Sequence, residues 1–228
     1  MTVLRSLIYY LVFYGWSAVI VIASVVALSL GSRHLRAVVH AWSRWHRWCL
    51  KNLIGISVEV EGNLGDEPAL YAIKHESFFE AIDMPMLLKS PSVFAKRELF
   101  AIPGWGISAS VYGLIPVSRN DGAKALRQML SKAKEMVGEG RPLVIFPEGT
   151  RVPKGNKPAL QSGFLGLYKL LGLKVIPVAV NSGQLYHRLL KKPGIITYKI
   201  GKPIPPGLPR AEVESQVHAA INALNTVC

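Results

Sequence analysis

Residues 75–80 (HESFFE) place a histidine five positions before a carboxylate, directly after the apolar run 69–73. This run predicts a buried strand, and sites in α/β proteins usually lie where such a strand ends. If His75 belongs to the loop and Glu80 to the first turn of a following helix, the carboxylate can bind one imidazole nitrogen and leave the other as a base. Glu76 is a competing partner, and a purely structural histidine is the alternative. No second histidine lies at metal-ligand spacing, so we expect no metal site.

A second candidate site follows another apolar run, at residues 146–151 (FPEGTR). The predicted strand stops at Pro147, and Gly149 permits unusual backbone angles and a close approach of a ligand. Arg151 suits a phosphate because its guanidinium presents a planar fork of donors. A tight turn with a surface ion pair is the alternative interpretation.

The elements that must position these residues are strands alternating with helices, which predicts an α/β fold over residues 55–228. Asp121 is expected to cap a helix that runs to about residue 137. Pro177 indicates that its strand is irregular or lies at a sheet edge. The strand-like runs are 56–61, 69–73, 92–95, 143–146, 175–180 and 195–200, and the helical ones are 121–137, 164–171 and 211–224.

The composition indicates a partner that is both apolar and anionic. Half of the 228 residues are hydrophobic and 18% are charged, which argues against a disordered chain, and the net charge is +13. A lipid surface explains both properties, whereas nucleic acid explains only the charge. Cys49 and Cys228 form neither a disulfide framework nor a metal motif, so we expect a reducing compartment.

The membrane signal lies in the first 54 residues, which we expect to form a separate region of membrane-embedded and interfacial helices. Residues 7–30 carry no charge and are long enough to cross a bilayer, with a cleaved signal peptide as the alternative. The segment after them is basic and rich in tryptophan, which predicts an interfacial helix, with a core-packed helix as the alternative. The residues expected at the interface are Arg33, Arg36, Trp42, Arg44, Trp45, Arg47 and Trp48.

The first 58 residues contain six basic residues and no acidic one. This bias places the end after residue 30 in the cytosol, so we expect an inner-membrane protein whose site faces the cytosol. A re-entrant hairpin, with residues 7–30 and 33–54 in one leaflet, fits the sequence equally well.

The two motifs together, in this order and about 70 residues apart, resemble the 1-acyl-sn-glycerol-3-phosphate acyltransferases (PlsC-like glycerolipid acyltransferases). That family has His-x4-Asp followed by FPEGTR. Residues 95–99, 113–119 and 175–180 resemble three further family blocks, and the likeness covers about residues 55–205. Glu80 replaces the family aspartate and lengthens the side chain by one methylene. Asp83 is an alternative partner for the histidine.

This resemblance implies a mixed, largely parallel sheet flanked by helices, and transfer of an acyl group from acyl-CoA or acyl-carrier protein to a lysophospholipid hydroxyl. It implies that His75 and Glu80 are catalytic, that no cofactor is needed, and that the partners are membrane lipids and these two substrates, not nucleic acid. Backbone amides near Gly149 would then stabilise the oxyanion. The residues it assigns to the acceptor phosphate and glycerol are Lys96, Arg119, Glu148, Gly149, Thr150 and Arg151.

Three alternatives stay open on the sequence. The acceptor can be another lysolipid, such as a lyso-ornithine lipid or a lysophospholipid with a headgroup. A histidine and a carboxylate can also activate water, which would make the chain a hydrolase. The chain can also be a non-catalytic lipid-binding membrane protein that keeps the fold.

Overall fold

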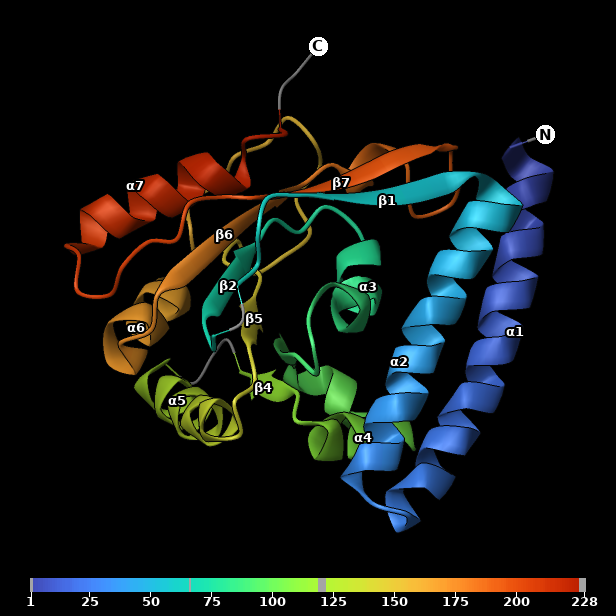
Figure 1. Ribbon diagram of the computed structural model, residues 1–228, viewed down its shortest axis with the longest axis horizontal. Helices are drawn as coiled ribbons and strands as arrows, with labels where there is room; N and C mark the ends of the chain where they lie inside the picture. Colours follow the sequence, from blue (N-terminus) through green and yellow to red (C-terminus); the bar gives the residue numbers. More distant parts are fainter. Residues whose placement is uncertain (1, 66, 119–121, 226–228) are drawn as a thin grey trace.

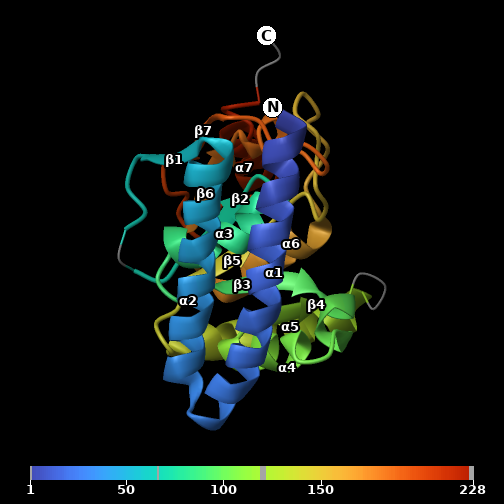
Figure 2. The same cartoon turned by 90° about the vertical axis from the view of Figure 1, so that its right-hand side faces the viewer.

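The computed structural model describes residues 2–65, 67–118 and 122–225 (Figure 1). Two long helices, α1 (Thr2–Ser29) and α2 (Ser32–Cys49), form a hairpin along one side of the molecule. The chain reverses at Gly31, whose φ of 101° is in the left-handed region that glycine adopts readily. Helix α2 continues as a π-helical turn, Leu50–Ile54, and the α/β part begins just beyond it. Figure 2 shows α1 and α2 side by side, with their turn pointing away from the sheet.

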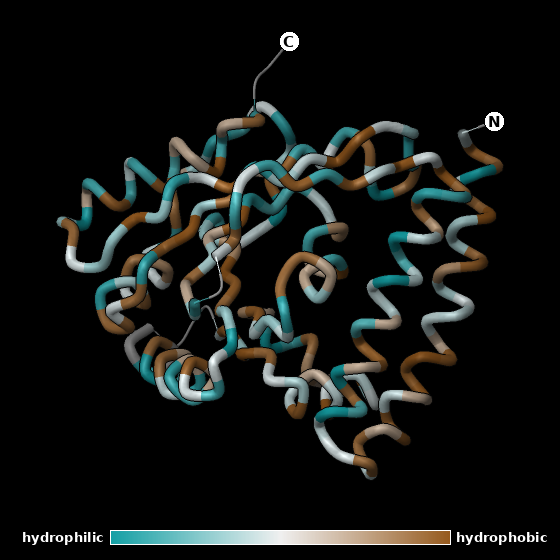
Figure 3. Tube along the Cα trace, viewed as in Figure 1, coloured by the Kyte–Doolittle hydropathy of each residue, from teal (hydrophilic) through white to brown (hydrophobic). Residues whose placement is uncertain are grey.

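Helix α1 contains residues 7–29 of the charge-free stretch and starts five residues before it. Within the described chain it is the one helix that is long and apolar enough to cross a membrane, and only 17% of its most apolar 18 residues are buried in the protein. In Figure 3 it is mostly brown, whereas α2 has hydrophilic residues along its length. A helix of 28 residues is about 42 Å long, which exceeds a hydrocarbon core of about 30 Å.

Helix α2 packs against the protein more than a purely interfacial helix would. The Trp42 indole donates to Ser17 Oγ of α1 at 2.9 Å and stacks on Phe13. Arg47, which we expected at the membrane interface, instead forms a two-pronged ion pair with the fully buried Asp83, with both N–O distances at 2.7 Å. The guanidinium turns inward because the Asp83 carboxylate would otherwise be buried without a counter-charge. Arg33, Arg44 and Trp48 remain exposed.

The described residues form a seven-stranded sheet in the order β1-β7-β6-β2-β5-β3-β4. Neighbouring strands are parallel except for the antiparallel pair β6 and β7, so the expected mixed, largely parallel sheet is confirmed. The strands are β1 (Ile56–Glu61), β2 (Leu70–Ile73), β3 (Ser92–Lys96), β4 (Ile115–Val117), β5 (Leu143–Ile145), β6 (Val175–Val180) and β7 (Gly194–Ile200).

Both faces of the sheet are covered, which is why its central strands are continuous apolar runs. Along β2, Tyr71 and Ile73 face a core shared with the hairpin, while Leu70 and Ala72 face a second core on the other side. The remaining helices are α3 (Phe79–Leu87), α4 (Trp105–Tyr112), α5 (Gly122–Gly138), α6 (Ser162–Leu171) and α7 (Arg210–Ile221), with 3-10 turns at Arg97–Ala101 and Ser182–Gln184.

Pro177 lies in the interior of the sheet, so an edge position for its strand is wrong. Strand β6 runs between β7 and β2, and Pro177 pairs with Ala72 of β2. The Pro177 carbonyl accepts from Gly201 N just beyond the end of β7. The pairing of β6 with β7 starts at Val178, so the missing N–H of Pro177 faces the end of β7, where the regular ladder has stopped. The sheet therefore tolerates the proline.

Candidate active site

The two motifs leave the sheet side by side because they follow neighbouring parallel strands. Ala72 of β2 pairs with Ile145 of β5, so the loops after both strands start at the same carboxyl-terminal end of the sheet. The loops are joined by a hydrogen bond of 2.7 Å from Val152 N to His75 O. Sites of α/β proteins commonly form at such carboxyl ends.

His75 lies on the loop and Glu80 in the first turn of α3, as their spacing requires for contact. His75 Nδ1 is 3.0 Å from Glu80 Oε2, and the Ser77 amide donates to the same oxygen at 2.9 Å. The histidine side chain is 14% exposed, whereas that of Glu80 is fully buried. Asp83 faces Arg47, so it is not the partner of the histidine. The extra methylene of glutamate is thus accommodated with the carboxylate beside the imidazole.

Two serines complete the environment of Glu80. Ser182 Oγ donates to Glu80 Oε1, and Ser77 Oγ lies 2.7 Å from Ser182 Oγ. Because the single Ser182 hydroxyl proton is used on the carboxylate, the Ser77 hydroxyl is the donor in the serine pair, and it also lies 3.4 Å from Glu80 Oε1. The Ser77 oxygen also accepts the Phe79 amide at 3.1 Å. Ser77 is therefore a buried hydrogen-bonded link, and sequence reasoning missed Ser182, whose only signal was its position after the strand 175–180.

Glu76 points away from the imidazole, toward the 3-10 turn after β6. Its Oε2 accepts the Gly183 amide at 2.8 Å, and burial raises the pKa of its carboxyl to about 7. The competing partner is thereby separated from His75. The backbone direction at the end of β2 separates the two side chains. His75 faces the loop after β5, and the next residue, Glu76, faces the turn after β6.

Glu148 was expected to contact the substrate, but the structure buries it. Its side chain is fully buried and its Oε1 accepts from Lys74 Nζ at 2.6 Å. Lys74 is equally buried and also donates to Asn222 Oδ1 at 3.0 Å and to the Asn156 carbonyl at 3.2 Å. All three ammonium protons of Lys74 are used, so the pair ties the two loops to the segment after α7. A buried carboxylate requires such a counter-charge, and Lys74 went unassigned in the sequence.

The loop 146–151 presents its last residues to solvent. Phe146 stacks on the His75 ring, with the centroids 4.1 Å apart. Gly149 has φ 70°, and a Cβ there would lie 2.8 Å from Gln161 Cγ, so glycine is required by conformation and by space. The Gly149 amide donates to Phe146 O at 2.9 Å, which commits that amide to the turn and not to an oxyanion. Thr150 and Arg151 are exposed.

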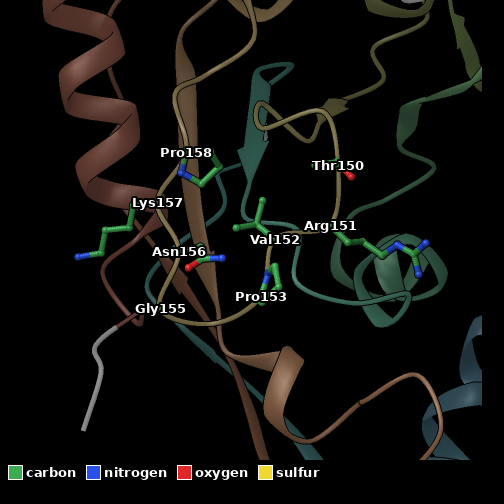
Figure 4. Close-up of a pocket in the computed structure, with 8 residues that line it drawn as sticks. All are labelled: Thr150, Arg151, Val152, Pro153, Gly155, Asn156, Lys157 and Pro158. Atoms are coloured by element: carbon green, nitrogen blue, oxygen red, sulfur yellow. The ribbon is translucent and has the colours of Figure 1, made fainter.

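The residues expected to bind phosphate are exposed cations where the structure describes them. Figure 4 shows Arg151 extending from its loop beside a depression lined by Thr150, Val152 and neighbouring residues. Its Cζ lies over the Phe78 ring, 3.9 Å from the centroid. Lys96 is exposed at the end of β3. It lies at the same carboxyl-terminal end of the sheet as His75, but two strands away. Arg119 and the capping Asp121 lie outside the described residues.

The arrangement is suited to proton abstraction beside a loop that presents an exposed arginine. A carboxylate on Nδ1 fixes the tautomer, which leaves Nε2 to accept a proton from a hydroxyl. Within the described chain, no three histidine, cysteine or acidic side chains are grouped as metal ligands.

Comparison with known proteins places the site in context. The family model described as "Acyltransferase" matches residues 55–181. A 1-acyl-sn-glycerol-3-phosphate acyltransferase of Pseudomonas aeruginosa is 32% identical over 194 residues, which cover 83% of this chain and 73% of that protein. One from Helicobacter pylori is also 32% identical, over 61% of this chain and 60% of the relative.

The fold also has a counterpart among solved structures. The crystal structure of the 1-acyl-sn-glycerophosphate (LPA) acyltransferase PlsC from Thermotoga maritima superposes with a TM-score of 0.78 over 100% of this chain and 99% of that one. The sequence identity in this comparison is 23%, so it supports the fold and not the details of the site.

Proposed function

Because the chain belongs to the family of 1-acyl-sn-glycerol-3-phosphate acyltransferases, we propose that it acylates the sn-2 hydroxyl of lysophosphatidic acid. The enzyme is an acyltransferase of class EC 2.3.1, and in this proposal the product is phosphatidic acid. The acyl donor is a thioester, acyl-CoA or acyl-carrier protein. The observation that carries the proposal is the contact of 3.0 Å between His75 Nδ1 and Glu80 Oε2, beside the loop that presents Arg151.

In the proposed reaction His75 Nε2 takes the proton of the acceptor hydroxyl as that oxygen attacks the thioester carbonyl. The tetrahedral intermediate collapses, the C–S bond breaks, and the imidazolium returns its proton to the departing sulfur. A thiol has an ordinary pKa near 8.5, so its thiolate leaves with little acid assistance. No acyl-enzyme is formed, in keeping with the buried, hydrogen-bonded hydroxyl of Ser77.

Glu80 orients the imidazole and stabilises its positive charge. It does so as an acceptor held by the Ser77 amide and the Ser182 hydroxyl, which prevent the carboxylate from rotating away. The acceptor phosphate binds to Arg151, with Lys96 and Arg119 as further cations. Thr150 and Gly149 shape the loop against the glycerol.

The apolar face of α1 anchors the protein in the membrane that contains the lysolipid. The high exposure of α1 and the basic segment that follows it support this placement. The excess of basic residues in the first 58 positions further favours a site that faces the cytosol, where acyl thioesters are dissolved.

The test is acyl transfer to lysophosphatidic acid by the full chain in vesicles, with membrane binding measured in parallel by sedimentation. His75→Ala should lower kcat by about 100- to 10,000-fold while the protein stays on the membrane. The matched control is His187→Ala, which removes an exposed histidine outside the site. Near-normal turnover of His75→Ala would exclude it as the base.

The role of Arg151 is tested in the same assay. Arg151→Ala should raise the apparent KM for lysophosphatidic acid more than it lowers kcat, because the guanidinium binds a group that does not react. Release of thiol in the absence of any lysolipid, at the same rate as in its presence, would indicate a hydrolase instead.

A further inference from the structure

Two aromatic contacts interlock the two motifs in a reciprocal way. The histidine of residues 75–80 stacks on Phe146, and the arginine of residues 146–151 lies over Phe78. Each motif thus supplies one polar group and one aromatic ring that supports the polar group of the other. Phe146 directly follows the buried strand β5, and the backbone of Phe78 caps α3, so neither ring is placed by chance.

Phe78 and Phe79 are adjacent and yet differ completely in burial. Phe79 is fully buried and packs near Tyr186 and Tyr198, with ring centroids 5.9 and 5.8 Å away. Phe78 leaves half of its surface exposed. Exposure of a phenyl ring forgoes hydrophobic burial, so Phe78 contributes little to the core. Its defined partner is the guanidinium of Arg151.

Arg151 has no other anchor among the residues that the structure describes, which provide it with neither a hydrogen bond nor an ion pair. A cation over an aromatic face is attracted by the ring quadrupole. This contact uses the ring face and leaves the N–H donors of the guanidinium unpaired, so they can bind a phosphate in bidentate fashion. Figure 4 shows the side chain extended, with its guanidinium away from the other lining residues.

We propose that Phe78 is a positioning residue that holds Arg151 ready for the acceptor phosphate and so sets the affinity for the phosphorylated lysolipid. This inference rests on the proposed function, in which Arg151 binds that phosphate. Phe78 lies three residues after His75 and two before Glu80. The same short segment therefore fixes both the base and the support of the phosphate ligand, which sets the spacing between His75 and Arg151.

The experiment measures KM for lysophosphatidic acid and kcat, at saturating acyl-CoA, in detergent mixed micelles. Phe78→Leu keeps an apolar side chain but removes the ring, and we expect KM to rise about three- to tenfold with a smaller fall in kcat. Phe78→Trp restores the π face and should give a lower KM than Phe78→Leu. Leu170→Ala is the matched control, since Leu170 is equally exposed on α6.

A double variant separates positioning from a general structural effect. If Phe78 acts through Arg151, Phe78→Leu adds no further increase in KM to Arg151→Ala. Independent, multiplying effects of the two changes, or a parent-like KM in Phe78→Leu while Arg151→Ala raises it, overturn this inference alone. An unchanged KM in Arg151→Ala overturns the phosphate assignment of the proposed function as well.

Discussion

Removing the charge of Lys74 tests whether the buried ion pair with Glu148 holds the two motif loops together. Both side chains are fully buried, and Nζ and Oε1 are 2.6 Å apart. Lys74→Met keeps much of the side-chain length and leaves the Glu148 carboxylate without its counter-charge. It also removes the donors to Asn222 Oδ1 and to the Asn156 carbonyl.

The expected loss follows from this geometry. Breaking a buried ion pair on one side costs about 3–5 kcal/mol, because the remaining charge stays desolvated. For a chain of this size each kcal/mol lowers Tm by about 2–4 °C, so Lys74→Met should lower Tm by roughly 6–20 °C. Thermal unfolding in detergent, followed by circular dichroism at a fixed scan rate, measures this shift.

Two further variants make the result interpretable. Lys199→Met, at an exposed position on β7, should change Tm by less than about 2 °C. Lys74→Met combined with Glu148→Gln removes both charges and should unfold at a higher temperature than Lys74→Met alone. A Tm for Lys74→Met within 2–3 °C of the parent would refute the claim that an uncompensated buried charge decides the effect.

Ser182→Ala removes the hydroxyl that donates to Glu80 Oε1, and we expect kcat to fall by about 10- to 150-fold, in line with about 1.5–3 kcal/mol for a hydrogen bond to a charged group. Steady-state acyl transfer measures this, and a kcat equal to that of the parent would show that the serine does not support the carboxylate. For Glu76, burial raises the pKa of its carboxyl from 4.5 to about 7, so between these values the native state holds a proton that the unfolded chain has lost. Stability should therefore decrease as pH rises through this window, and Glu76→Gln should show a weaker decrease of Tm; an identical pH dependence in both proteins would contradict the buried carboxyl.

Residue types and spacing were sufficient to identify the acyltransferase family. The spacing allowed His75 and Glu80 to meet if one lay on the loop after a predicted strand and the other in the first turn of a helix, and it left Glu76 and Asp83 as alternative partners. The apolar, charge-free stretch likewise identified α1, since length and composition alone decide whether a helix can cross a bilayer. The alternation of strands and helices predicted the α/β class in the same way.

Local patterns could not predict the partners of Glu148 and Arg47. Each is a charged residue in a motif-like context, and each was expected at a surface where substrate or lipid binds. In the structure Glu148 pairs with Lys74, 74 positions away, and Arg47 pairs with Asp83, 36 positions away. Spacing within one helix or loop carries no information about such contacts.

The sequence by itself determined which groups are present and in what order along the chain: an apolar helix, a histidine, a carboxylate and a loop that ends in an arginine. The tertiary structure alone decided which carboxylate meets the histidine. Strand β2 has β6 on one side and β5 on the other, and His75 stacks on Phe146 after β5 while Glu76 accepts the Gly183 amide after β6. Glu80, in the first turn of α3, meets both His75 and Ser182. Ser182 is 102 positions from Glu80, and only strand pairing brings them together, because hydrogen bonds depend on distance in space and not along the chain.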